Sequence, residues 1–209
     1  MTSFIPTELF GGAIKSLMPQ GYIDSSQLRE IPDHQEIYLS PTTLTNIIIE
    51  INQRVGQDEN IHDDKSAARY HIRDICDNDD TFDESLFDPQ PTTIAGFPSG
   101  TAAYHGQVRI KPADTPTSVA DPSAAVPGAA VASSSSGDGL ELEKKTTTCH
   151  YLLIRLQGKE TDILVLVNVP HSELVNASGA VERENTLAST ILEQVRSTFE
   201  IKDMSLFGE

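Results

Sequence analysis

The most chemically dense part of the sequence lies between Asp24 and Glu36, where charged and amide side chains alternate with apolar ones. Asp24 is a good N-cap for a short turn that runs through Leu28. Pro32 stiffens the chain and biases Ile31 towards an extended conformation. A stiff loop holds several carboxylates in place and loses little entropy on binding. The residues alone therefore indicate either a helix-capping loop or a binding interface.

The residues that usually carry covalent chemistry do not form a recognisable motif. The sequence contains neither GxxxxGK[ST] nor GxGxxG, the loops that cradle phosphates, and it has no GxSxG nucleophile elbow. Its six histidines are scattered, and Cys76 and Cys149 lack the basic neighbours that would activate a thiolate. We therefore expect a binding or regulatory protein rather than an enzyme, and we expect no cofactor.

Two acidic segments match metal sites only in part. The string His62-Asp63-Asp64 could touch a metal, but a solvated loop is the favoured interpretation. The string from Asp77 begins like a calcium loop, but its sixth position holds Phe82 where the turn requires glycine. We expect no metal site. A small metal-assisted hydrolase built on His62 and neighbouring carboxylates stays open as an alternative.

The charge balance narrows the class of partner. The chain of 209 residues has 15 Lys and Arg against 31 Asp and Glu, which gives a net charge of −16. This excess argues against nucleic acid and against an anionic membrane, since both need a basic surface. We see no secretory signal, and the apolar runs are too short for a membrane span. Two cysteines fit a reducing compartment, so we expect a soluble intracellular protein.

Two stretches differ in composition from the rest of the chain. Residues 57–90 carry eleven acidic and three basic residues, half of the net charge. They form either a solvated loop or a patch that steers a basic partner by long-range attraction. Residues 112–139 hold 20 Pro, Ala, Ser or Gly out of 28, which predicts a flexible loop. Because the part after this loop is short, we expect one domain over residues 1–209, interrupted at 112–139.

Periodicity predicts the regular elements. Leu44, Ile48, Ile51 and Val55 share one helical face, and residues 184–200 show the same pattern. Four runs are typical of strands, with a hairpin turn at Lys159 between the last two: Ala67–Ile75, Ala102–Ile110, Tyr151–Leu156 and Ile163–Val169. Sequential hairpin strands between helices predict an α/β fold, an α/β/α sandwich with a central, mainly antiparallel sheet flanked by helices.

Five segments together resemble one known family. They are ELFGGAI, YIDSSQLREIPDHQEIY, AARYHIRDI, TDILVLVNVP and SLFGE. The chain is similar in them to the Ran guanine nucleotide release factor family, whose members have a Mog/PsbP-like fold. The pattern IDxSxLRxxPDxQE, which runs from Ile23 to Glu36, is long and specific. The resemblance covers the chain from about Glu8 to its end, except the 112–139 insertion and much of the acidic segment.

This resemblance implies a function and a set of residues. It implies binding to the small GTPase Ran and release of its guanine nucleotide, in support of nuclear protein import, in the nucleus and also the cytoplasm. The matching partner-binding positions are Asp24, Leu28, Arg29, Glu30, Pro32, Asp33, Gln35 and Glu36. An acidic Ran-binding adaptor without exchange activity is the alternative. The oligomeric state is not fixed by the sequence, and a monomer is the simplest expectation.

A physical mechanism follows as a hypothesis. A GTPase holds its nucleotide with a P-loop lysine and Mg²⁺, both cationic. A carboxylate from Glu30, Asp33 or Glu36 could pair with such a cation. Binding to a state with weaker nucleotide contacts lowers the affinity for nucleotide by thermodynamic reciprocity, so no nucleophile or general acid is required.

Overall fold

The computed structural model describes residues 2–76, 81–82, 87–111, 145–156 and 158–207. Its helices are α1 (Asp64–Asp74) and α3 (Ala180–Thr198), and its 3-10 turns are η1 (Phe10–Gly12), η2 (Ser25–Gln27), η3 (Gln57–Glu59) and η4 (Met204–Phe207). Its strands are β1 (Phe4–Leu9), β2 (Ile14–Pro19), β3 (Ile23–Asp24), β4 (Gln35–Leu39), β5 (Asn46–Gln53), β6 (Thr81–Phe82), β7 (Gln90–Thr92), β8 (Ala102–Lys111), β9 (Thr147–Leu156), β10 (Thr161–Pro170) and β11 (Glu200–Ile201).

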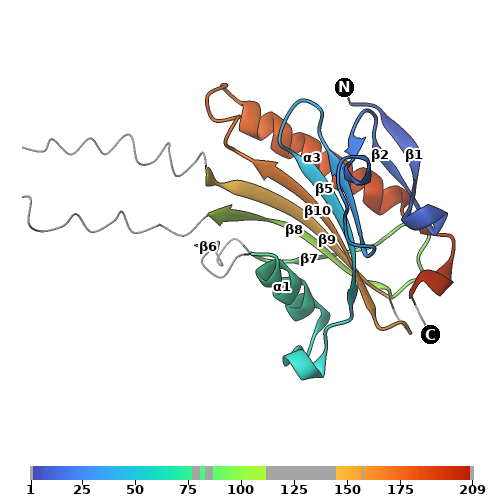
Figure 1. The fold of residues 1–209 in the computed structure, drawn as a ribbon. Helices are drawn as coiled ribbons and strands as arrows, with labels where there is room; N and C mark the ends of the chain where they lie inside the picture. The colour runs from blue at the N-terminus through green and yellow to red at the C-terminus, as the bar shows by residue number, and fades with distance from the viewer. Residues whose placement is uncertain (1, 77–80, 83–86, 112–144, 157, 208–209) are drawn as a thin grey trace, which may run out of the picture.

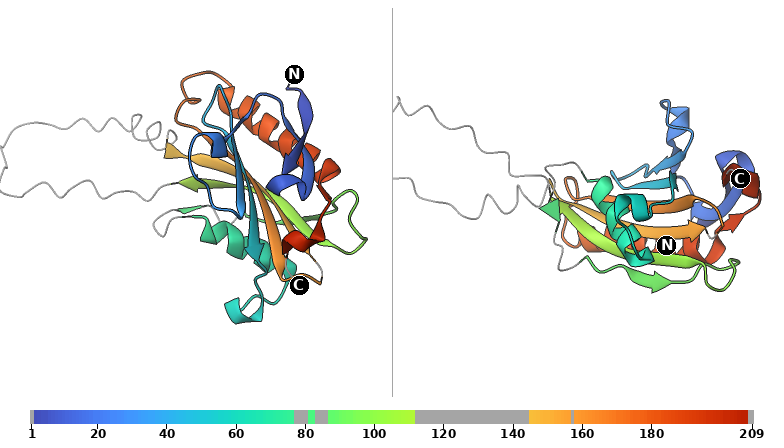
Figure 2. Two further views of the ribbon diagram at one scale, coloured as in Figure 1. Left: turned by 45° about the vertical axis from the view of Figure 1, so that its right-hand side comes forward. Right: turned by 90° about the horizontal axis from the view of Figure 1, so that it is seen from below.

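A large antiparallel sheet forms the middle layer (Figure 1). Its strand order is β3-β4-β5-β10-β9-β8-β6, and β7 also pairs with β8. Helix α1 lies on one face of this sheet and α3 on the other (Figure 2). A smaller sheet of order β1-β2-β11 packs into the same core as α3. The α/β/α sandwich with a mainly antiparallel sheet is therefore confirmed.

The central strands are apolar nearly throughout because both faces of the sheet are covered. Ile163 and Val165 of β10 pack in the core shared with α3. Leu164 and Leu166 alternate with them and pack in the core beneath α1. Successive side chains of a strand point to opposite faces of the sheet. When both faces are covered, both sets of side chains are buried, so the strand is apolar at nearly every position.

The predicted helix over residues 44–55 is wrong, because the segment forms β5. The steps from Leu44 to Val55 do fit a helical face, but the run Ile47-Ile48-Ile49 also fits a strand covered on both sides. Ile47 and Ile49 are buried in the α3 core, while Ile48 packs against the α1 core. Pairing with β4 and β10 on either side fixes the extended form.

The predicted strand over residues 67–75 is also wrong, because the segment lies in α1. Asp63 caps this helix by accepting hydrogen bonds from the backbone N–H and the hydroxyl of Ser66. The buried residues of the helix are spaced with a helical period: Ala67, Ala68, His71 and Ile72. The alternation of Tyr70 and Ile72 that indicated a strand is thus coincidental.

The other predicted elements are confirmed. Ala102–Ile110, Tyr151–Leu156 and Ile163–Val169 fall in β8, β9 and β10, and residues 184–200 fall largely in α3. Lys159 lies in the turn that joins β9 to β10. The predicted loop at 112–139 lies outside the described residues, as does part of the acidic segment 57–90. The described part of that segment forms η3 and α1 rather than a continuous loop.

One glycine in the sheet is required by a close approach. Gly106 of β8 lies opposite Tyr151 of β9, whose ring crosses over it. A methyl group added at Gly106 would collide with the Tyr151 hydroxyl and ring. The absence of a side chain at this position lets the buried tyrosine pack on the strand.

Candidate functional site

A shallow depression of about 510 Å³ lies where three distant segments of the chain meet. One wall is the segment from Asp24 to Glu36, a second is Phe10 with Gly11 in η1, and a third is Leu206 in η4. Seven of the eight residues implied by the resemblance line this space: Asp24, Arg29, Glu30, Pro32, Asp33, Gln35 and Glu36. Only Leu28 of that set lies outside it. We call this space the acidic depression.

The first part of the loop is held by capping bonds. Asp24 accepts a hydrogen bond of 2.8 Å from the backbone N–H of Ser26, as its N-cap position predicts. The carbonyl of Ser25 then accepts from the N–H groups of both Leu28 and Arg29, at 2.9 and 3.1 Å. The short turn predicted through Leu28 is therefore confirmed, and the Asp24 carboxylate is partly occupied by it.

The end of the loop is fixed to the sheet. The N–H of Gln35 donates to the carbonyl of Pro32, and the carbonyl of His34 accepts from the N–H of Ile51 in β5, both at 2.9 Å. The side chain of Gln35 donates to Glu50 at 3.0 Å. Bonds on both sides thus restrict the segment that carries Glu30 and Asp33, as a preorganised binding loop requires.

The half-buried carboxylate of Glu36 is engaged by groups of its own chain. One of its carboxylate oxygens accepts from the N–H of Phe10 at 2.6 Å, and the other lies 3.5 Å from the Tyr38 hydroxyl. Burial raises the pKa of Glu36, the Phe10 hydrogen bond opposes this rise, and the charge of Asp24 adds to it. Phe10 has a positive φ of 49°, and its bond to Glu36 ties this unusual backbone to the loop. Glu36 therefore joins η1 to the depression.

Five of the eight implied residues are exposed at the surface: Leu28, Arg29, Glu30, Pro32 and Asp33. Within the part of the chain that the structure describes, the side chains of Glu30 and Asp33 make no hydrogen bond or ion pair. Leu28, which precedes them in the chain, is 66% exposed. The depression thus presents two free carboxylates on a fixed frame, with an exposed apolar side chain, Leu28, outside its border.

Sequence reasoning missed Phe10, Gly11 and Leu206 as site residues. The segments ELFGGAI and SLFGE that contain them were part of the resemblance, but nothing in their spacing showed that they border the same space. Neither segment contains a charged cluster of its own. The one feature that could have marked them as part of the site is that both belong to the pattern shared with the family.

The buried polar groups elsewhere hold elements together. Asp162 of β10 bonds to His71 of α1 and to Arg155 of β9. His150 of β9 bonds to Asn185 of α3 at 2.8 Å, and burial lowers the pKa of its ring. Among the described residues, no three or more His, Cys, Asp or Glu side chains are grouped to hold a metal ion. No described helix has the length and apolar character needed to cross a membrane.

Comparison with known proteins identifies the family of the chain. Residues 7–170 match the family described as Ran-interacting Mog1 protein. The chain belongs to the Ran-interacting Mog1 family. The match includes η1 and the whole loop from Asp24 to Glu36, and it ends before η4.

Relatives in this family match the chain along most of its length. The Ran guanine nucleotide release factor of Danio rerio is 26% identical over 202 residues, which cover 96% of this chain and 98% of that protein. The nuclear import protein MOG1 of Saccharomyces cerevisiae is 28% identical over 221 residues, which cover 96% of this chain and 84% of that protein. These relatives are named as release and import factors.

Solved structures agree on the fold. The crystal structure of the Saccharomyces cerevisiae Ran-binding protein Mog1p matches with a TM-score of 0.62 and 25% identity, over all of both chains. The solution structure of cyanobacterial PsbP from Synechocystis matches with a TM-score of 0.53 at 11% identity, over 96% of this chain and 94% of that one. The second likeness concerns the fold alone.

Proposed function

We propose that this protein binds the small GTPase Ran and promotes release of its guanine nucleotide, in support of nuclear protein import. The observation that carries this is the acidic depression, where a family-specific loop presents free carboxylates on a rigid frame. The chain acts as a single Ran-binding domain in the nucleus and also in the cytoplasm. It needs no covalent catalysis, because release is a shift of a binding equilibrium.

Glu30 and Asp33 are the carboxylates that contact Ran. They are exposed and unpaired among the described residues, whereas Glu36 is engaged with Phe10 and Asp24 with Ser26. A lysine that holds phosphate in a GTPase can pair with a carboxylate only by giving up contacts with its nucleotide. A protein that binds this state more tightly lowers the affinity of the GTPase for its nucleotide. By thermodynamic linkage, bound nucleotide lowers the affinity of the GTPase for that protein by the same factor.

Leu28 supplies an apolar contact beside the charges. Interfaces commonly surround a few well-packed side chains with a polar rim. Leu28 lies next to Arg29 at the start of the loop and is free to be covered by a partner. Pro32 keeps the intervening chain stiff, so its role is to fix the positions of Glu30 and Asp33.

Charge reversal tests this proposal. The double variant Glu30→Lys/Asp33→Lys should bind Ran about 30-fold or more weakly, because loss of a desolvated charge partner costs ~2–5 kcal/mol. Release of labelled GDP or GTP from Ran should slow in parallel. The matched control is Glu173→Lys/Glu182→Lys, which changes the net charge equally at exposed positions near the start of α3. Unchanged binding and release in the first variant would refute the placement of the site.

The same assay distinguishes a nucleotide-release factor from the alternative, an adaptor without exchange activity. An acidic adaptor without exchange activity would bind Ran with the affinity of a release factor, yet it would leave the rate of nucleotide release at that of Ran alone. We expect instead that the wild-type protein accelerates release and that the effect saturates as the binding site on Ran is filled.

A further inference from the structure

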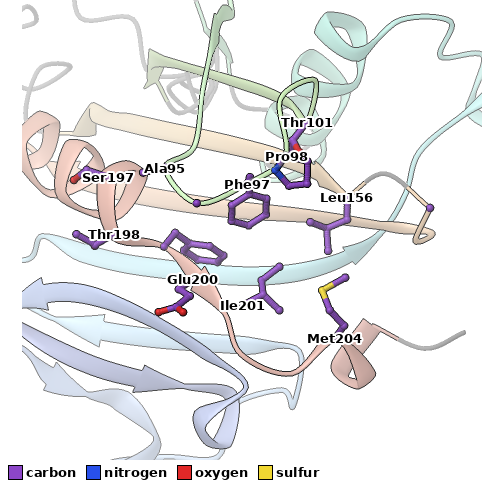
Figure 3. Close-up of a pocket in the computed structure, with 13 residues that line it drawn as sticks. Ala95, Phe97, Pro98, Thr101, Leu156, Ser197, Thr198, Glu200, Ile201 and Met204 are labelled. Atoms are coloured by element: carbon purple, nitrogen blue, oxygen red, sulfur yellow. The ribbon is translucent and has the colours of Figure 1, made fainter.

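A second and more apolar pocket lies on the other side of the C-terminal turn from the acidic depression. It has a volume of about 760 Å³ and is bordered by the loop before β8, the end of β9, and β11 with η4. Phe97, Leu156, Ile201 and Met204 surround one space in Figure 3. The volume is sufficient for a large aliphatic or aromatic side chain.

The walls of this pocket are well fixed, but among the residues that the structure describes its rim is partly open to solvent. Leu156 and Phe199 are buried in the core, and the Phe97 ring lies 6.2 Å from that of Phe199. The N–H of Ala95 bonds to the carbonyl of Arg196 at 3.1 Å, which fixes the loop to the end of α3. Met204 at the rim is nevertheless 46% exposed. Preformed apolar walls with an open rim are typical of a site that an incoming apolar group completes.

The backbone beside the pocket offers hydrogen bonds. Within the described ranges of the chain, strand β11 pairs with β2 on one side only, so it is an edge of the small sheet. The backbone N–H of Lys202 donates to the carbonyl of Ala13. In an antiparallel pair every second residue bonds to the facing strand, so the preceding bonded residue of β11 is Glu200, opposite Lys15. The N–H and C=O of Ile201 consequently point away from β2. An extended segment laid along this edge can bond to Ile201 while it places a side chain in the pocket.

The turn η4 is shared by the two sites. Met204 borders the apolar pocket, and Leu206, two residues on, borders the acidic depression. A protein surface that covers the depression therefore reaches the rim of the pocket across a single turn of chain. This continuity, and not the apolar character alone, indicates the occupant.

We propose that the apolar pocket takes a hydrophobic side chain carried on an extended segment of the same GTPase that the acidic depression binds. The inference rests on the proposed function and gives it a second anchor. Apolar contact supplies affinity, while Glu30 and Asp33 supply charge recognition. A partner held on both sides of η4 is also held in one orientation, which places the carboxylates against a defined part of its surface.

The test changes the rim of the pocket without touching the depression. Met204→Glu puts a charge where the apolar side chain would sit, and we expect the Kd for Ran to rise about tenfold or more. Met204→Leu keeps an apolar side chain and should stay within about twofold of wild type. Leu44→Glu adds the same charge at an exposed leucine in the β4–β5 turn, at the far end of β5 from the pocket, and should also leave the Kd unchanged.

A covalent readout makes the test independent of the folding of Met204→Glu. A photoreactive benzoylphenylalanine at position 204 should crosslink to Ran when the complex is illuminated. A Met204→Glu protein that is folded by circular dichroism and binds Ran like wild type would overturn the inference. Crosslinking of position 204 to a second copy of the chain instead of Ran would overturn it as well.

The two proposals fail in different ways. If Glu30→Lys/Asp33→Lys abolishes binding while Met204→Glu has no effect, the pocket is not a Ran contact and the proposed function stands. If neither variant changes binding, both proposals are refuted.

Discussion

Replacing Asp162 by alanine should destabilise the fold more than any surface charge change. Asp162 is fully buried in β10, and its carboxylate accepts hydrogen bonds from His71 at 2.9 Å, from Arg155 at 3.0 Å and from the N–H of Val55 at 3.2 Å. Arg155, which is 4% exposed, also bonds to Asp64 at 2.8 Å. The carboxylate thus joins α1, β9, β10 and the segment after β5.

The expected loss is about 3–5 kcal/mol of unfolding free energy. Removal of one partner of a buried ion pair leaves the other charge without compensation, and such changes cost ~3–5 kcal/mol. In Asp162→Ala, Arg155 keeps Asp64 and the carbonyl of Val55, so the loss should fall in the lower half of that range. Since small domains have about 5–15 kcal/mol in total, this is a large share of the stability.

Urea unfolding followed by circular dichroism measures the effect, with the m value checked for constancy. The matched control is Glu193→Ala, which removes an exposed carboxylate paired with Arg196 at 2.6 Å. Exposed pairs contribute about 0–1 kcal/mol, so the control should lose little. If Asp162→Ala loses no more than Glu193→Ala, the assignment of Asp162 as the link between the layers is wrong.

The same network predicts how stability depends on pH. Burial alone would raise the pKa of Asp162, but the His71 hydrogen bond and the Arg155 charge outweigh it and hold the pKa below its ordinary value. The unfolded carboxyl titrates near pH 4. The contribution of Asp162 is therefore complete above about pH 4 and is lost as pH falls through the lower folded-state pKa. Asp162→Ala should flatten this acid limb of the stability curve.

Two further changes test the sheet and the depression. Gly106→Ala should destabilise the fold by about 1–3 kcal/mol, because the new methyl group displaces the Tyr151 ring; thermal unfolding measures this, and an unchanged midpoint would contradict the packing described here. Glu36→Ala should cost about 1–3 kcal/mol by leaving the N–H of Phe10 without its acceptor, whereas Glu36→Gln should retain most of the stability because its amide oxygen can still accept. Equal urea midpoints for the two Glu36 variants would show that this bond is unimportant.

Local sequence patterns were sufficient to predict the elements whose stabilising contacts come from residues close in the sequence. The apolar runs of β9 and β10 with the turn at Lys159 predicted a hairpin, and the Asp24 cap predicted the turn η2. Residues 44–55 and 67–75 were assigned wrongly because their apolar spacing fits two periods. For residues 44–55, pairing with β10 decided in favour of a strand. For residues 67–75, the N-cap at Asp63 and the helical spacing of the buried residues decided in favour of a helix.

The sequence by itself determined the family-specific loop, its acidic character and the apolar strands that support it, because each is a property of residues close together in the chain. Only the tertiary structure decided which carboxylates are free. Glu36 is engaged by Phe10, 26 positions away, while Glu30 and Asp33 are left exposed. The same holds for Leu206, which reaches the depression from the other end of the chain. Hydrogen bonds and packing between distant segments form only on folding, so no local spacing reports them.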